Sequence, residues 1–100
     1  MSDINREESN TGGRYTYQID GGPLAELTYS KTGETMIIID HTDVPNSYRG
    51  QGVGEKLVAQ VVDDMRAAGK KIIPLCPFAN AQFHKHPDWQ DVLTGRRKGD

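Results

Sequence analysis

A glycine-rich stretch between an apolar run and a helical run constrains this 100-residue chain more than any other feature. It reads Val44-Pro45-Asn46-Ser47-Tyr48-Arg49-Gly50-Gln51-Gly52-Val53-Gly54. The run before it, residues 36–39, predicts a buried strand, and the run after it, residues 53–68, predicts a helix. Glycines leave the backbone bare where the helix begins, and the first turn of a helix carries unpaired N–H groups. The stretch therefore predicts an anion-binding loop with Arg49 as a cation at its edge.

Two familiar phosphate loops do not match this stretch. A Walker A loop requires Gly-Lys-Ser/Thr, whereas Gly54 is followed by Glu55-Lys56-Leu57. A dinucleotide-binding fingerprint requires a third glycine at the position of Glu55. A tight connection without any ligand is the competing interpretation of the glycines, and the spacing alone leaves both open.

Two segments resemble motifs of the GNAT superfamily of acetyltransferases. Residues 49–54 resemble its acyl-CoA motif, Arg/Gln-x-x-Gly-x-Gly/Ala. The run Asn80-Ala81-Gln82-Phe83-His84-Lys85 is similar to a shortened form of the signature in the last helix of that family. The resemblance covers residues 14–93 and is to the short, single-domain branch of the superfamily. It implies an N-acetyltransferase with acetyl-CoA, or coenzyme A after transfer, as its co-substrate.

The expected fold is of the α/β (α+β) class. A strand, a helix and a strand in succession imply a parallel pair with a right-handed crossover. Three successive isoleucines favour burial of the third strand on both faces, and Pro74 favours an edge or a splay in the fourth. We expect a mixed, mostly antiparallel sheet of about four strands with a parallel splayed pair, one long crossover helix and a short C-terminal helix. The expected strands are residues 14–20, 24–29, 34–40 and 71–76, and the expected helices are residues 53–68 and 78–86.

Composition bounds the organisation and the partners of the chain. We expect a flexible leader over residues 1–13, a single domain over residues 14–93 and a polar tail over residues 94–100. No stretch has the apolar core of a signal peptide or the length of a membrane span. The single cysteine suits a reducing cytoplasm, and the net charge of −2 argues against nucleic acid as a partner.

His41 and Cys76 should lie near each other, because parallel strands that share a crossover helix end at the same edge of the sheet. His41 is a candidate general base, since an ordinary imidazole titrates near neutrality; it is equally a turn histidine without a catalytic task. Cys76 has three interpretations: a buried small hydrophobe, a polar contact or acid at a thioester, and a nucleophile that takes the acetyl group first.

Further site residues follow only from the resemblance. It implies that the diphosphate of CoA lies against Arg49 and the loop that follows, and that the pantetheine arm runs near Val44. It also implies that Asn80, Phe83 and Lys85 contact CoA. The alternatives are that Asn80 caps the helix, that Phe83 is a core residue and that Lys85 is solvated. The family's leaving-group acid is usually a tyrosine, and His84 is the candidate substitute here. The diphosphate-binding set is Arg49, Gly50, Gln51, Gly52, Val53 and Gly54.

The resemblance leaves the acceptor open. Full-length family members carry two helices between their first two strands, whereas only Asp20-Gly21-Gly22 lies there in this chain. We therefore expect an acceptor site that is open and shallow or is completed by another chain, and that suits an amine of a protein or peptide. The rivals are a non-catalytic module that binds CoA or acyl-CoA, and a structural domain without a nucleotide ligand. No paired metal-ligand spacing is present, so no metal is expected.

Overall fold

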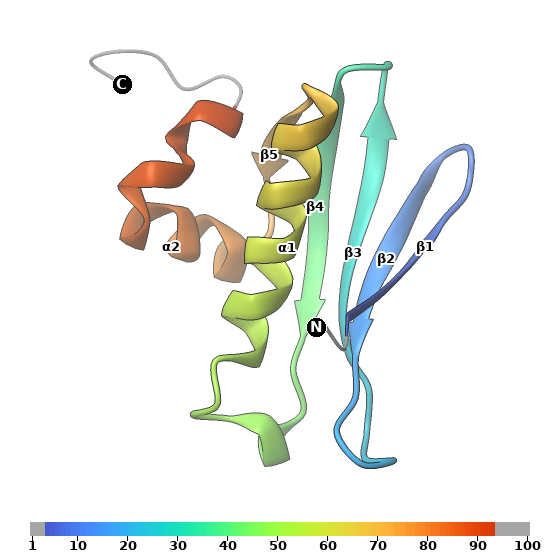
Figure 1. Cartoon of the computed structure of the whole chain (residues 1–100), viewed down its shortest axis with the longest axis vertical. Coiled ribbons are helices and arrows are strands. Elements are labelled where there is room, and N and C mark those ends of the chain that lie inside the picture. The colour runs from blue at the N-terminus through green and yellow to red at the C-terminus, as the bar shows by residue number, and fades with distance from the viewer. Residues whose placement is uncertain (1–3, 94–100) are drawn as a thin grey trace.

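A computed structural model describes residues 4–93 and contains one five-stranded sheet in the order β1-β2-β3-β4-β5 (Figure 1). Neighbouring strands are antiparallel except β4 and β5, which are parallel. The strands are Ile4–Glu8 (β1), Gly12–Tyr17 (β2), Ala25–Thr32 (β3), Met36–Asp43 (β4) and Lys71–Pro74 (β5). The helices are Val53–Ala68 (α1) and Pro77–Lys85 (α2), and the 3-10 helices are Asn46–Tyr48 (η1) and Pro87–Val92 (η2).

The predicted crossover is confirmed, because α1 connects the parallel strands β4 and β5. Its bounds are those that the sequence predicted. The helix ends at Gly69, whose left-handed conformation (φ 72°) lets its N–H reach the carbonyls of Met65 and Arg66. Pro74 is the last residue of the edge strand β5, as its missing N–H group requires.

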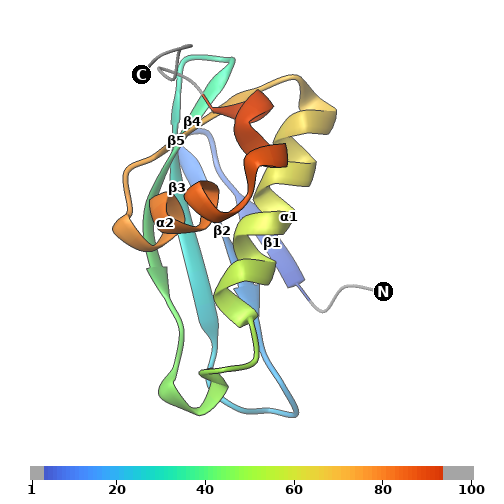
Figure 2. The same ribbon diagram turned by 90° about the vertical axis from the view of Figure 1, so that its left-hand side faces the viewer.

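The helices pack on one face of the sheet (Figure 2). This explains why burial alternates along β3 and in the first half of β4. In β4, Ile37 and Ile39 are buried, whereas Ile38 is half-buried on the opposite face. The prediction that β4 is buried on both faces is therefore wrong: three consecutive isoleucines reflect the strand preference of β-branched side chains as well as burial.

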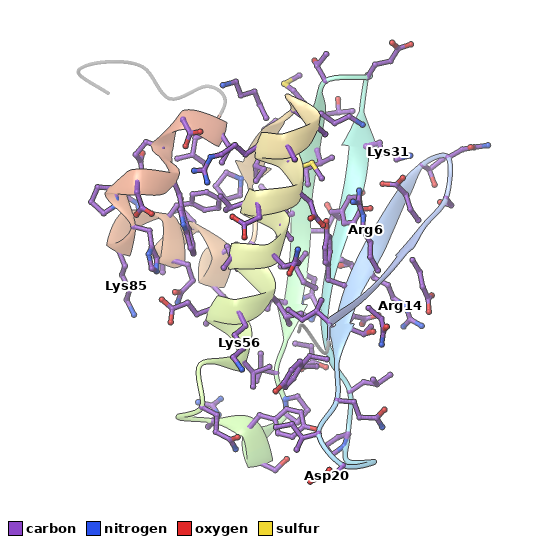
Figure 3. The ribbon with its side chains drawn as sticks, in the orientation of Figure 1. Arg6, Arg14, Asp20, Lys31, Lys56 and Lys85 are labelled. Atoms are coloured by element: carbon purple, nitrogen blue, oxygen red, sulfur yellow. The ribbon has the colours of Figure 1, made fainter. Side chains whose placement is uncertain are left out.

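The prediction of a flexible leader over residues 1–13 is wrong for the part that the structure describes; residues 1–3, and the predicted tail at 94–100, lie outside the described residues. β1 pairs with β2 along its whole length. β1 can be polar because its charged side chains contact aromatic side chains of β2 and β3. The Arg6 guanidinium lies over the rings of Tyr15 and Tyr29, 5.4 and 5.9 Å from their centroids. Figure 3 labels Arg6 among the side chains of the sheet.

The carboxylate of Glu8 completes this attachment of β1. Tyr29 Oη donates a hydrogen bond of 2.7 Å to Glu8, and Arg6 lies 2.8 Å from the same oxygen. The hydrogen bond from Tyr29, with the Arg6 contact, holds the pKa of Glu8 at about 2, below its ordinary value of 4.5.

Replacing Glu8 tests this attachment through its pH dependence. The unfolded chain binds more protons than the folded one between the two pKa values, so the stabilisation by Glu8 is present above about pH 4.5 and is lost towards pH 2. Glu8→Gln should lower the free energy of unfolding by about 1 kcal/mol at pH 7, allowing for an exposed fraction of 37%. Urea denaturation at several pH values should show that difference disappearing in acid. The exposed Glu34→Gln is the control, and a difference independent of pH would contradict the assignment.

Candidate functional site

A cavity of about 550 Å³ opens between the end of β4, the loop that follows it, the first turn of α1, and α2. It contains both backbone groups and charged side chains, and it lies at the carboxyl end of β4, as the sequence predicted for the ligand site. Its lining residues are Thr42, Asp43, Val44, Tyr48, Arg49, Gly50, Gly52, Val53, Gly54, Glu55, Phe78, Gln82 and Lys85.

The glycines give the loop its shape. Gly50 (φ 82°) and Gly52 (φ 72°) both adopt the left-handed conformation, which favours residues without a Cβ atom. Gly52 is the N-cap of α1, and the first intrahelical bond runs from the Lys56 N–H to the Gly52 carbonyl. Among the described residues, the N–H groups of positions 52–55 have no protein acceptor. The four residues that carry these amides line the cavity, at the positive end of the dipole of a sixteen-residue helix.

Gln51 does not share this property, although the sequence placed it in the binding set. Its N–H donates to the Tyr48 carbonyl over 3.2 Å, and its side-chain amide donates to the Ser47 carbonyl over 3.1 Å. Gln51 is also absent from the cavity lining. Its observed contacts stabilise the turn before α1, while the next four amides stay open.

Tyr48 anchors this loop to the turn between β2 and β3. Its hydroxyl accepts a hydrogen bond of 3.0 Å from the Ile19 N–H and donates one of 2.6 Å to the Pro23 carbonyl. Tyr48 is 5% exposed and packs edge-on against the ring of Tyr17, with centroids 6.3 Å apart. The loop is therefore fixed to the body of the sheet at its entry.

Gly54 serves close packing. A Cβ atom at this position would lie 2.5 Å from the ring of Phe78 and 3.3 Å from a methyl group of Val44. The Phe78 ring, carried by α2, lies against the bare backbone of α1 and forms one wall of the cavity.

The cations in the cavity lining are Arg49 and Lys85, and their predicted contacts with a ligand stay predictions. Arg49 Nε donates to Asn46 Oδ1 over 2.9 Å, which holds the exposed guanidinium against the loop. Figure 3 labels Lys85 on α2 and Lys56 on α1. Lys56 is not in the lining; its ammonium lies 5.3 Å from the centroid of the Tyr17 ring. Glu55 is the acidic residue of the first turn of α1.

Cys76 lies just outside the cavity lining, at the N-cap of α2. It is 6% exposed, and its Sγ is 3.5 Å from Oγ1 of Thr42, which does line the cavity. Burial acts to raise the pKa of the thiol, but hydrogen bonds with Thr42 and with the N–H groups of Ala79 and Phe78 outweigh it and lower that pKa. The pKa of this thiol, beside the end of β4, therefore lies below its ordinary value.

His41 lies on the opposite face of the sheet from Cys76. The register between β3 and β4 shifts at this point: Tyr29 pairs with Ile39 and Thr28 pairs with His41, so that Asp40 is the extra residue of a bulge. Leu27 and Tyr29 are buried on the side of the helices, so Thr28 between them points to the opposite face of the sheet. His41 pairs with Thr28, and paired residues share a face, so His41 also points away from the helices. The bulge turns Thr42 towards Cys76 instead.

The remaining predicted residues lie on α2. His84 is exposed in its last turn and does not line the cavity. Asn80 is half-buried inside the helix, so its alternative interpretation as a cap is wrong; the cap is Cys76, whose carbonyl accepts the Asn80 N–H over 2.9 Å. Phe83 is fully buried and packs edge-on against Trp89 with ring centroids 5.5 Å apart. These three side chains are absent from the cavity lining.

Several lining residues were not predicted as site residues. Two of them could have been inferred from the sequence: Thr42 lies at the end of a predicted strand, and Tyr48 lies directly before the glycine-rich loop. Phe78 and Gln82 come from α2, whose orientation against α1 is a tertiary feature. Within residues 4–93, no group of three or more His, Cys, Asp or Glu is arranged to hold a metal ion.

This strand order, crossover helix and glycine-rich first turn are those of an acetyltransferase fold, and the chain belongs to the GCN5-related N-acetyltransferase family. The family model matches residues 14–92. The chain is also similar to a candidate GCN5-like N-acetyltransferase from Staphylococcus aureus, solved by NMR. The two share 34% identity and a TM-score of 0.72, over 99% of this chain and 96% of that one.

Similarity to curated proteins is more limited. The chain is 25% identical to human Protein NATD1 over 75 residues, which is 74% of this chain and 66% of that protein. It is 40% identical over 65 residues to outer membrane protein U of Vibrio parahaemolyticus, covering 63% of this chain and 19% of that protein. The chain thus spans about a fifth of the length of this much longer relative. Among residues 4–93, no helix combines the length and apolar character of a membrane span.

The contact between Gly54 and Phe78 can be tested with a double-mutant cycle. Gly54→Ala alone should leave the free energy of unfolding unchanged or lower, because the new methyl group displaces the Phe78 ring and cancels the gain in helix propensity. In a Phe78→Ala background the same substitution should stabilise by about 1 kcal/mol. Chemical denaturation of the four proteins measures the coupling, and equal effects of Gly54→Ala in both backgrounds would exclude the contact.

Proposed function

We propose that the protein transfers an acetyl group from acetyl-CoA to an amine. The observation that carries this proposal is the set of N–H groups at positions 52–55, which have no protein acceptor among the described residues and open into a cavity. A diphosphate matches such a set, because it is anionic and presents several acceptor oxygens. Because the chain belongs to a family of N-acetyltransferases, we propose that this diphosphate is the one in acetyl-CoA.

The parts of the proposed ligand would lie along the cavity and the end of β4. The diphosphate would take the bare amides, with Arg49 and Lys85 as neighbouring cations. The pairing of β4 with β5 ends at Ile39 and Pro74, and the Cys76 N–H is the last to reach β4. Residues 40–43 therefore extend past β5, and the backbone from there to Val44 is the proposed partner of the pantetheine arm.

The chemistry requires a C–N bond to form at the thioester carbonyl, the C–S bond to break, and the amine proton to leave. The lowered pKa of Cys76 suits a proton donor to the departing thiolate, and equally a nucleophile that accepts the acetyl group first. We favour the donor or polar contact, because Cys76 reaches the cavity through Thr42 and does not line it. His41, on the other face, has no contact with the thioester in this proposal, and His84 none from its exposed position.

We propose that the acceptor amine belongs to a protein or peptide in the reducing cytoplasm. A seven-residue connection, residues 18–24, is all that joins β2 to β3. Tyr48 holds this connection beside the cavity. An open site of this kind suits a side chain or a chain terminus better than an enclosed metabolite.

A module that binds CoA without turnover is the second candidate. The last helix carries no tyrosine, and the histidine that stands near the expected position, His84, does not reach the cavity. Incubation with acetyl-CoA and a peptide library, followed by detection of the free CoA thiol, separates the two functions. CoA binding without thiol release above background would favour the module.

Two variants of Gly52 test the binding site. Asn and Asp both tolerate the left-handed conformation and differ by one charge, so Gly52→Asn is the matched control for Gly52→Asp. Thermal shift and calorimetry with acetyl-CoA should show binding to the wild type, weaker binding to Gly52→Asn, and a further loss of about tenfold for Gly52→Asp. Equal affinity of all three proteins would remove the first turn of α1 from the site, and no binding to the wild type would overturn the proposal.

Cys76→Ala should lower kcat by about a hundredfold while leaving the affinity for CoA unchanged. The reason is that the thiol contacts Thr42 at the thioester end and not the amides at positions 52–55. Steady-state kinetics and CoA titration measure the two effects separately. Normal turnover would remove Cys76 from the mechanism, and an acetylated protein trapped without an acceptor would establish the nucleophile instead.

A further inference from the structure

Glu55 places a negative charge where the proposed ligand is also negative. It is the third residue of α1 and lines the cavity beside the bare amides. One of its oxygens lies 3.9 Å from the position that a Cβ atom on Gly52 would occupy. A carboxylate at this position of a helix can fold back onto the N-cap N–H, and the helix dipole favours it there. Glu55 is thus a potential competitor for the amides of its own helix.

His86 is the residue that holds this carboxylate. Its Nε2 lies 2.6 Å from the other oxygen of Glu55. A carboxylate only accepts hydrogen bonds, so Nε2 carries the proton and donates it. Within residues 4–93, no lysine or arginine lies within ion-pair distance of Glu55. The neighbouring Lys56 contacts the Tyr17 ring instead.

The imidazole of His86 is itself fixed in place. Its ring stacks on that of Trp89 with centroids 3.8 Å apart and an angle of 12° between the planes. Trp89 is 7% exposed and rests on the fully buried Phe83. The His86 carbonyl also accepts the Trp89 N–H over 3.0 Å. Packing against the core through η2 therefore supports the imidazole that reaches Glu55, and this support defines the geometry of the contact.

We propose that His86 is a positioning residue that holds the Glu55 carboxylate away from the amides at positions 52–55, so that a diphosphate can occupy them. This inference rests on the proposed function for its ligand. His86 lies at the junction between α2 and η2, outside both sequence motifs, residues 49–54 and 80–85. In the absence of His86, Glu55 turns onto the N-terminus of α1 and competes with the ligand.

The ligand-dependent test is a cycle of four proteins titrated with CoA by calorimetry: wild type, His86→Ala, Glu55→Gln, and the double variant. His86→Ala should weaken binding about five- to tenfold, the effect of one like charge close to a diphosphate at a partly solvated site. Glu55→Gln should bind at least as tightly as the wild type, and the double variant should match Glu55→Gln. His86→Gln, which retains a donor, should recover part of the affinity. An equal loss from His86→Ala in both backgrounds would overturn the proposal.

A second measurement separates this inference from the proposed function, because it needs no ligand. Amide hydrogen exchange of Gly52, Val53 and Gly54 should be slower in His86→Ala than in the wild type, since the released carboxylate now caps them, and the additional change Glu55→Gln should restore fast exchange. Far-UV circular dichroism checks that each variant is folded, because the fluorescence of Trp89 changes when the stacked His86 ring is removed. Unchanged exchange in His86→Ala would exclude the inference even if CoA binds. Slower exchange with no CoA binding to the wild type would exclude only the proposed function.

Discussion

The unpaired N–H groups at the start of α1 are the constraint on which the arrangement of the site depends. A helix cannot satisfy its own first amides, and buried donors without partners are destabilising, so they must face water or a ligand. The chain satisfies this requirement by opening a cavity in front of them. Left-handed glycines before the helix remove the side chains that would otherwise fill the space, and Tyr48 fixes the loop to the sheet.

The second helix completes the site from outside the motif. Phe78 packs on the bare backbone of Gly54, and Lys85 brings a cation to the same cavity. The N-terminus of α2 also holds Cys76, whose thiol receives hydrogen bonds from the first turn of that helix. Two helix N-termini therefore meet at the site: that of α1 carries N–H groups without an acceptor among the described residues, and that of α2 lowers the pKa of a thiol.

The sequence predicted those features that depend on local pattern. The regular spacing of Leu57, Val61 and Met65 defines α1, and the glycines define its first turn. The strand β1 was missed because its inward residues are charged, and their aromatic partners, Tyr15 and Tyr29, belong to other strands. The contact between Glu55 and His86 joins residues 31 positions apart and depends on how η2 packs. The roles of the individual site residues stay predictions.

The bulge at Asp40 divides β4 into two halves of opposite phase. Up to Ile39 the odd-numbered side chains enter the core, whereas beyond the bulge the even-numbered Thr42 faces the helices and His41 faces away. One continuous strand can thus supply a hydrophobic wall along half of its length and a polar border that lines the cavity along the rest. Without the extra residue, the alternation of the strand would point His41 at the helices and Thr42 away from them, so one bulge decides which side chain of β4 meets Cys76.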